Sequence, residues 1–203
     1  MLRSLLLIIS FINSPLSLAG NTDRSILVVG DSISAAYGID QTTGWVHLLE
    51  SKLTQKKKPY QVINASISAD TTINGLKRLP ALLKQYRPAV TIIELGGNDG
   101  LRGLSLKSMK KNLATMIKLC LQADSKVILA GMRIPPNYGK RYTQGFYQIY
   151  QDLNKNHEIT LIPFILQGIG DKKELMQKDG LHPTEQAQKV ILHTVWKKLK
   201  QVL

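Results

Sequence analysis

Ser32, Asp179 and His182 are the side chains of this sequence best suited to nucleophilic chemistry. Ser32 follows a short apolar run, so its hydroxyl can stand exposed where a strand ends. Asp179 and His182 lie three residues apart near the other end of the chain. A carboxylate that accepts the Nδ1 proton of an imidazole fixes the tautomer and leaves Nε2 as a base toward a serine hydroxyl. These residue types therefore indicate covalent catalysis by an activated serine.

Each of these residues also has an ordinary structural interpretation. A lone Gly-Asp-Ser at a strand end favours a helix cap or a turn, and the Gly-x-Ser-x-Gly elbow found in other hydrolases is absent. His182, however, is framed by Gly180 and Pro183, which predicts a loop. The remaining histidines lie within or beside helical patterns: His47, His157 and His193. The pairing of Asp179 with His182 is what favours catalysis over a cap.

Acyl transfer by a serine also requires donors for the tetrahedral oxyanion, and Asn98 is the candidate side chain. It follows Gly96 and Gly97 after another apolar run. Loss of one such donor typically raises the activation free energy of the reaction by about 3–4 kcal/mol. A turn asparagine would fit the same sequence. The backbone N–H groups of Ser32 and of a turn near Ala69 would complete an oxyanion hole.

The elements that must position these residues follow from alternating patterns along the chain. Five short apolar runs alternate with longer helix-period segments, which is typical of parallel βαβ units. The predicted strands are 26–29, 61–64, 90–94, 126–130 and 160–162. The predicted helices are 44–53, 72–86, 105–122 and 184–203, with a kink or break at Pro80. Hydrophobicity is continuous within the strands, so we expect an α/β fold with helices on both faces of the sheet.

Three candidate residues, Ser32, Ala69 and Asn98, each lie after the end of a predicted strand. Ligands of open α/β sheets collect at the carboxyl ends of the strands, so Ser32, Ala69 and Asn98 are expected at one edge. The segment 132–142 has no clear periodicity and contains two prolines and a glycine. It is therefore expected to be a loop over the binding site.

Four ordered blocks, 30–33, 64–68, 96–99 and 179–183, together resemble the GDSL or SGNH hydrolases. The resemblance is greatest to the bacterial periplasmic thioesterase and lysophospholipase members, and it extends through essentially all of the chain after residue 19. It implies a flavodoxin-like three-layer α/β/α fold with a central parallel five-stranded sheet, and neither metal nor cofactor. By position, it implies Ser32 as nucleophile, Asp179 and His182 as its partners, and Asn98 as oxyanion donor with the N–H groups of Ser32 and Ala69.

Ala69 departs from the family pattern, which has glycine at this position. An alanine keeps the N–H that the oxyanion hole uses. If the position requires positive φ, however, the Cβ introduces strain or displaces the donor.

The resemblance also implies which residues border the substrate. The segments after Asn98 and around 132–142 resemble the loop pair beside the acyl pocket of the family. The residues expected to bind substrate are Leu101, Arg102, Ile134 and Pro135.

Length and composition narrow the class of protein. The 203 residues fit one domain, and the single cysteine, Cys120, excludes an internal disulfide and a thiolate metal cluster. The formal net charge is +13, but the basic residues are dispersed, so a nucleic acid is not expected as a partner. The basic surface would instead suit peripheral contact with an anionic membrane or an anionic lipid substrate. We expect a monomer.

The first 19 residues have the order of parts of a secretory signal peptide. Arg3 is followed by the apolar run 5–12, and small residues ending at Ala19 offer a cleavage site. The run is too short to span a bilayer. The expected organisation is a signal peptide at 1–19 and an SGNH hydrolase domain at 20–203, exported to the periplasm or secreted.

These observations predict a serine esterase that hydrolyses acyl esters and thioesters through an acyl-enzyme. The activities expected are those of a lysophospholipase, thioesterase or arylesterase, acting on a small acyl ester or a lysophospholipid. A carbohydrate O-deacetylase of the same family is the alternative enzyme. A catalytically weak lipid-binding protein is the alternative from another class, and Ala69 alone favours it.

Overall fold

The computed structural model describes residues 24–203, so the predicted signal peptide at 1–19 lies outside the described residues. Five parallel strands form one sheet in the order β2-β1-β3-β4-β5. Their bounds are Arg24–Gly30 for β1, Tyr60–Asn64 for β2, Val90–Glu94 for β3, Lys126–Ala130 for β4 and Thr160–Ile162 for β5. This is the flavodoxin-like order, and the predicted α/β fold with a central parallel sheet is confirmed.

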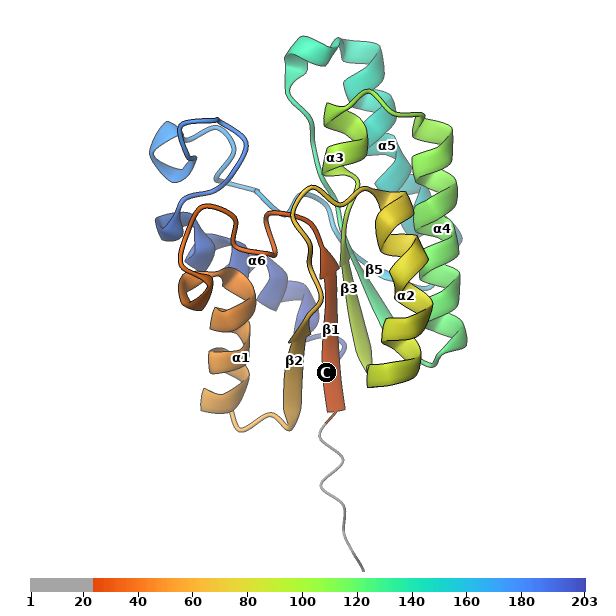
Figure 1. The fold of residues 1–203 in the computed structure, drawn as a ribbon, viewed down its shortest axis with the longest axis vertical. Helices are drawn as coiled ribbons and strands as arrows, with labels where there is room; N and C mark the ends of the chain where they lie inside the picture. Colours follow the sequence, from red (N-terminus) through yellow and green to blue (C-terminus); the bar gives the residue numbers. More distant parts are fainter. Residues whose placement is uncertain (1–23) are drawn as a thin grey trace, which may run out of the picture.

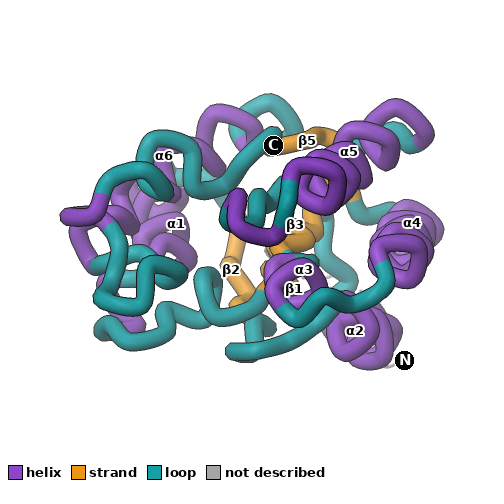
Figure 2. Tube along the Cα trace, turned by 90° about the horizontal axis from the view of Figure 1, so that it is seen from above, coloured by secondary structure: helices purple, strands orange, loops and turns teal. Residues whose placement is uncertain are grey.

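Helices cover both faces of this sheet and make the three layers seen in Figures 1 and 2. On one face α1 packs beside α6, and on the other α4 packs between α2 and α5. The bounds are Trp45–Gln55 for α1, Thr72–Tyr86 for α2, Leu106–Gln122 for α4, Lys140–Asn156 for α5 and Gln188–Leu199 for α6. A short helix, α3 (Gly97–Leu101), follows β3. Within residues 24–203, no helix is long and apolar enough to cross a membrane.

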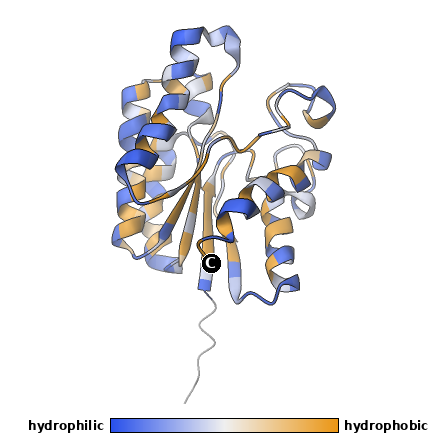
Figure 3. Ribbon diagram, turned by 180° about the vertical axis from the view of Figure 1, so that it is seen from behind, coloured by the Kyte–Doolittle hydropathy of each residue, from blue (hydrophilic) through white to orange (hydrophobic). Residues whose placement is uncertain are grey.

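The core lies between the sheet and the inward faces of the helices. Strand β3 is buried along its whole length, as are the apolar residues of β1. Figure 3 shows these apolar strands between helices that are apolar on one side and polar on the other. Because both faces of the sheet are covered, side chains that carry chemistry have access to solvent only at the strand ends.

Two expectations about local structure were wrong in part. The segment 132–142 is not a loop throughout, because α5 begins at Lys140 and a 3₁₀ turn covers Pro136–Tyr138. The break considered at Pro80 does not occur, because helix α2 continues through this residue. Pro80 is exposed, so water can reach the carbonyl it leaves unpaired, while buried Leu79 and Leu83 anchor the helix on both sides.

The order of the strands determines where a site can form. The chain passes from β1 to β2 on one side and then to β3 on the other side of β1. The connections that follow β1 and β3 therefore leave the sheet toward opposite faces, and a site is expected between them at the carboxyl edge. Ser32 follows β1 and Asn98 follows β3, so both lie at this switch point.

Candidate active site

The loop after β1 presents Ser32 in a tight, helix-like turn. Its backbone is fixed by hydrogen bonds from Ala35 N–H to the Asp31 carbonyl (2.9 Å) and from Tyr37 N–H to the Ser32 carbonyl (3.0 Å). Gly30 allows the turn to approach β3, because a Cβ there would lie 2.7 Å from Glu94 Oε2. Glycine is therefore required where the strand leads into the serine turn.

The loop between β5 and α6 carries Asp179 and His182. It is closed by a hydrogen bond from Gln177 N–H to the His182 carbonyl (2.7 Å). The Gln177 side-chain amide then donates to the carbonyls of Tyr37 (2.8 Å) and Pro183 (3.0 Å). One glutamine therefore ties the histidine loop to the serine loop, although the two are about 140 residues apart in sequence.

The structure brings Ser32, His182 and Asp179 into one hydrogen-bonded line. His182 Nε2 is 2.9 Å from Ser32 Oγ, and His182 Nδ1 is 2.6 Å from Asp179 Oδ2. The other oxygen, Asp179 Oδ1, accepts the N–H groups of Leu181 (2.9 Å) and His182 (3.0 Å). Burial alone would raise the pKa of Asp179, but these hydrogen bonds from His182 and Leu181 lower it to about 2. Asp179 is therefore ionised at neutral pH, as an orienting carboxylate must be.

Tyr37 is a member of this site that sequence reasoning missed. Its ring lies 4.6 Å from the His182 ring, centroid to centroid, at an interplanar angle of 41°. The ring therefore limits rotation of the imidazole from one side. No sequence pattern pointed to it, because an aromatic residue in a loop has no characteristic spacing from its partner.

Asn98 is presented by the first turn of α3. Gly96, before it, has φ of +115°, and a Cβ there would overlap the Tyr150 hydroxyl, so both backbone and space require glycine. The Asn98 amide donates one hydrogen to Asp31 Oδ2 at 3.1 Å. Within residues 24–203, its second amide hydrogen donates to no protein acceptor. Asp31 therefore holds the amide whose role as an oxyanion donor was predicted.

Asp31 and Glu94 form a buried acidic pair behind the serine, which the sequence analysis did not identify. Glu94 is fully buried, and its Oε2 accepts the Ser34 hydroxyl (2.6 Å) and the Asp31 N–H (3.3 Å). Burial raises the pKa of Glu94 well above its usual value, and the charge of Asp31 raises it further. Burial also raises the pKa of Asp31 to about 6, against opposing hydrogen bonds from Ile33 and Asn98. The sequence feature that could have indicated this pair is Glu94, an acidic residue at the end of an otherwise mostly apolar strand.

Ala69 has φ of +66°, the backbone conformation in which an alanine is strained. Its carbonyl accepts a hydrogen bond from Arg102 Nη2 at 3.0 Å, which fixes the orientation of the turn. Within residues 24–203 the backbone N–H groups of Ser32 and Ala69 donate to no protein acceptor, so both are free for a ligand. The condition under which alanine at this position introduces strain is therefore met.

We predict that Ala69→Gly leaves kcat for ester hydrolysis unchanged or raises it, because glycine adopts positive φ without strain and retains the N–H. Steady-state kinetics on a p-nitrophenyl ester test this. Asp124→Gly is the matched control, since Asp124 also has positive φ but lies in a turn before β4, at the opposite edge. A large loss of kcat confined to Ala69→Gly would contradict the prediction.

The four predicted substrate-binding residues fall in two places. Ile134 and Pro135 line a cavity of about 480 Å³ that is also bordered by Leu181, the neighbour of His182, while Ser32 and His182 themselves do not line it. Leu101 and Arg102 do not line it. The Leu101 carbonyl instead accepts the Tyr138 hydroxyl (2.8 Å), and Arg102 contacts Ala69.

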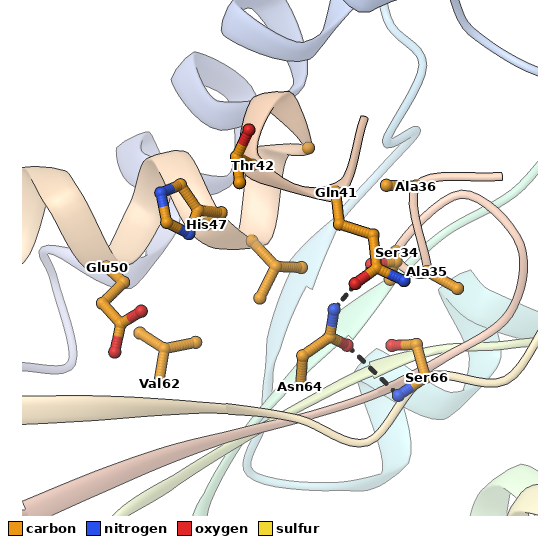
Figure 4. Close-up of a pocket in the computed structure, with 12 residues that line it drawn as sticks. Ser34, Ala35, Ala36, Gln41, Thr42, His47, Glu50, Val62, Asn64 and Ser66 are labelled. Atoms are coloured by element: carbon orange, nitrogen blue, oxygen red, sulfur yellow. Dashed lines mark hydrogen bonds between the residues drawn. The ribbon is translucent and has the colours of Figure 1, made fainter. Parts of the chain in front are cut away.

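A second cavity, of about 360 Å³, lies behind the serine loop between α1 and β2 (Figure 4). There the Asn64 amide donates to the Ser34 carbonyl (2.9 Å), and Asn64 Oδ1 accepts the Ser66 N–H (3.1 Å). Neither Ser32 nor His182 lines this cavity. Asn64 therefore supports the serine loop from outside the candidate active site. Within residues 24–203, no three His, Cys, Asp or Glu side chains gather so as to hold a metal ion.

Comparison with known sequences gives matches along most of the chain. Residues 28–190 match the GDSL-like lipase/acylhydrolase family. The chain is 47% identical to the esterase TesA of Pseudomonas aeruginosa, over 89% of this chain and 90% of that protein. It is 44% identical to an arylesterase of Vibrio mimicus, over 98% of each chain. It is 40% identical to thioesterase 1/protease 1/lysophospholipase L1 of Escherichia coli K12, over 88% of this chain and 85% of that protein.

Solved structures agree with the sequence matches. The crystal structure of TesA superposes with a TM-score of 0.87 and 47% identity, over 89% of this chain and 100% of that one. The psychrotrophic esterase EstA from Pseudoalteromonas, in a structure inhibited by monoethylphosphonate, has a TM-score of 0.84 and 41% identity, over 88% of this chain and 98% of that one.

Proposed function

We propose specific catalytic roles for the residues of this site on the premise that the chain belongs to the GDSL-like lipase/acylhydrolase family and is a serine ester hydrolase. Ser32 is the nucleophile, His182 the general base and acid, and Asp179 the carboxylate that orients His182. The observation that carries this assignment is the continuous hydrogen-bonded line from Ser32 Oγ through His182 to Asp179. Inhibition of the relative EstA by monoethylphosphonate supports a nucleophile of this kind.

The chemistry follows from the distances. Ser32 Oγ attacks the carbonyl carbon of the ester, and its proton passes to His182 Nε2, 2.9 Å away. When the bond to the leaving alcohol or thiol breaks, His182 returns this proton to the leaving group. Water then attacks the acyl-enzyme, loses a proton to His182, and releases the carboxylic acid. His182 then protonates Ser32 and regenerates the free enzyme.

The oxyanion formed in both steps needs donors that are already oriented. We assign this role to the N–H groups of Ser32 and Ala69 and to the Asn98 amide. Asp31 holds the amide on one side, and Arg102 holds the Ala69 carbonyl on the other. Donors fixed in advance need no reorganisation during the reaction, which is why such groups stabilise the transition state so effectively.

The substrate we propose is a small acyl ester with a medium or long acyl chain, such as a lysophospholipid. The cavity at the histidine loop supports this, because Ile134, Pro135 and Leu181 give it apolar walls. Hydrolysis of p-nitrophenyl esters from acetate to palmitate tests the proposal, and kcat/KM is expected to be greatest for a medium or long chain. A maximum at acetate would contradict it and favour the carbohydrate deacetylase.

We further propose that residues 1–19 direct export and that residues 20–203 form the mature domain, which acts as a monomer in the periplasm or outside the cell. Arg3, the apolar run 5–12 and the small residue Ala19 support an export signal. An exported enzyme meets lysophospholipids and other envelope esters rather than cytosolic acyl-CoA. The enzyme would then be able to hydrolyse thioesters, but its physiological substrates would be acyl esters.

A further inference from the structure

The exposed apolar side chains of this protein are gathered at one end. Of the seven large apolar residues that are exposed within residues 24–203, six lie at the carboxyl edge of the sheet. We call these six the apolar crown: Tyr37, Ile67, Ile73, Leu104, Tyr138 and Leu181. Their exposed fractions range from 38% to 53%. The seventh, Leu121, lies in the last turn of α4, at the opposite edge.

The apolar crown surrounds the candidate active site rather than forming one side of it. Its members come from the segments that follow all five strands, so no single apolar stretch of sequence accounts for them. Tyr37 contacts His182, and Leu181 lines the cavity beside it. Tyr138 contacts the segment after Asn98 through the Leu101 carbonyl. A single acyl chain would occupy one groove and would leave the rest of this ring exposed to water.

Basic residues accompany the apolar crown on one side. We call them the basic corner: Arg102, Lys107, Lys140 and Arg141, all exposed. Lys107 lies in the first turn of α4, and Lys140 and Arg141 in the first turn of α5, and neither turn has an acidic residue. Hydrogen bonds from Tyr142 to the Leu104 carbonyl (3.3 Å) and from Tyr138 to Leu101 join this corner to the crown.

Three residues of the basic corner, Lys107, Lys140 and Arg141, differ from the other basic residues in their position on the helices. The amino end of a helix carries positive potential, so cations there are disfavoured by the helix itself. At the opposite edge, by contrast, Lys84 and Lys155 lie in last turns, where the helix favours a cation. Helix stability therefore accounts for Lys84 and Lys155 but not for Lys107, Lys140 and Arg141. Arg102, at the C-terminal end of α3, is the exception within the basic corner. An anionic partner does account for the other three.

We propose that the carboxyl edge of the sheet docks on the surface of an anionic lipid membrane. The apolar crown enters the headgroup region, and the basic corner lies against the phosphates. A single-chain lipid ester can then pass from the membrane to Ser32 without crossing water. This delivery of substrate, unlike the docking itself, rests on the proposed function. A second copy of the chain fits less well, because each copy has a formal net charge of +13 and would repel the other.

Vesicle binding by the Ser32→Ala protein tests the docking without turnover. The probe is vesicles of phosphatidylglycerol and phosphatidylcholine in equal parts, with co-sedimentation as the measurement. In this background, Ile73→Gln/Leu104→Gln and Lys140→Gln/Arg141→Gln are each expected to lower the partition coefficient by about tenfold or more. None of these four residues lines the cavity beside His182.

Matched controls at the opposite edge are Leu121→Gln and Lys56→Gln/Lys58→Gln, which are expected to leave binding unchanged. If the controls lowered the partition coefficient as much as the other variants, binding would not depend on the carboxyl edge, and the proposal would be overturned. An absence of vesicle binding at low salt, or a dimer that the crown variant abolishes, would also overturn it. The separate assay, hydrolysis of soluble p-nitrophenyl butyrate by the enzyme with Ser32 intact, reports on the proposed function alone.

Discussion

Replacing Ser32 with alanine is expected to lower kcat for p-nitrophenyl ester hydrolysis by at least about 10,000-fold. The variant lacks the oxygen that would form the acyl-enzyme, and within residues 24–203 no other hydroxyl hydrogen-bonds to His182 Nε2. Only water activated by His182 and the oxyanion donors would remain. The fold should persist, because the only hydrogen bond of the Ser32 hydroxyl within these residues is the one to His182.

The measurement compares steady-state rates and thermal unfolding of the two proteins. Ser108→Ala is the matched control, because Ser108 is exposed on α4 and its hydroxyl makes no hydrogen bond within residues 24–203. It should retain full activity. A fluorophosphonate probe should add one label per wild-type chain and none to Ser32→Ala. Activity within tenfold of wild type in a folded Ser32→Ala protein would refute the assignment of the nucleophile.

The sheet could be predicted from the sequence because both of its faces are buried. Each predicted strand lies within the observed one. Because ligands of open α/β sheets bind at the carboxyl ends of the strands, Ser32 and Asn98 could also be predicted to lie at the same edge. Helix α5 was not among the predicted helices, although Phe146, Ile149 and Tyr150 have helical spacing. Its first turns are polar and include Gly145, which conceals the pattern at the end where it joins the loop.

The parts of the site that could not be predicted depend on contacts between loops distant in sequence. The Gln177 bridge to Tyr37 and the pairing of Asp31 with Glu94 arise only once β1, β3 and the loop before α6 are packed together. Periodicity reports on how one element is buried, and it carries no information about such contacts. Motif blocks locate the reacting groups but not the residues that orient them.

The structure also changes what Ala69 implies. From sequence, Ala69 was the one feature that favoured a catalytically weak binding protein. Its positive φ shows that the turn keeps the conformation a glycine would adopt, and Arg102 holds the carbonyl in place. Ala69 therefore adopts the backbone conformation that glycine would have here, at the cost of local strain. This is why Ala69→Gly is expected to have a small effect, whereas loss of a reacting group has a large one.

Asp179→Asn is expected to lower kcat by about 1,000-fold, the second largest effect among these variants. The side-chain amide introduced by this substitution would donate a hydrogen to His182 Nδ1, which would place the imidazole proton on Nε2. That nitrogen could then no longer accept the Ser32 proton. We expect a smaller reduction in kcat than for a fully buried carboxylate in this role. The Asp179 side chain is 40% exposed, so water can partly replace the lost carboxylate as a hydrogen-bond partner of His182.

This substitution separates orientation of the imidazole from folding of the loop. The oxygen of the new side chain can still accept the N–H groups of Leu181 and His182, which Asp179 Oδ1 accepts now, so the loop should persist. Glu174→Gln is the matched control and should retain activity, because Glu174 is an exposed acidic residue of the same loop and does not line the cavity. Near-normal kcat in a folded Asp179→Asn protein would show that His182 finds its tautomer without this carboxylate.

The pKa of Asp179 adds a second readout with a definite sign. Its pKa in the folded protein, about 2, is lower than its usual value of 3.8, so the ionised carboxylate stabilises the fold. That contribution is complete above the unfolded pKa and is lost as pH falls through the folded one. The difference in free energy of unfolding between wild type and Asp179→Asn should therefore be constant at neutral pH and change between about pH 4 and pH 2. A difference that stays constant down to pH 2 would mean that His182 and the loop N–H groups do not hold the carboxylate as the distances indicate.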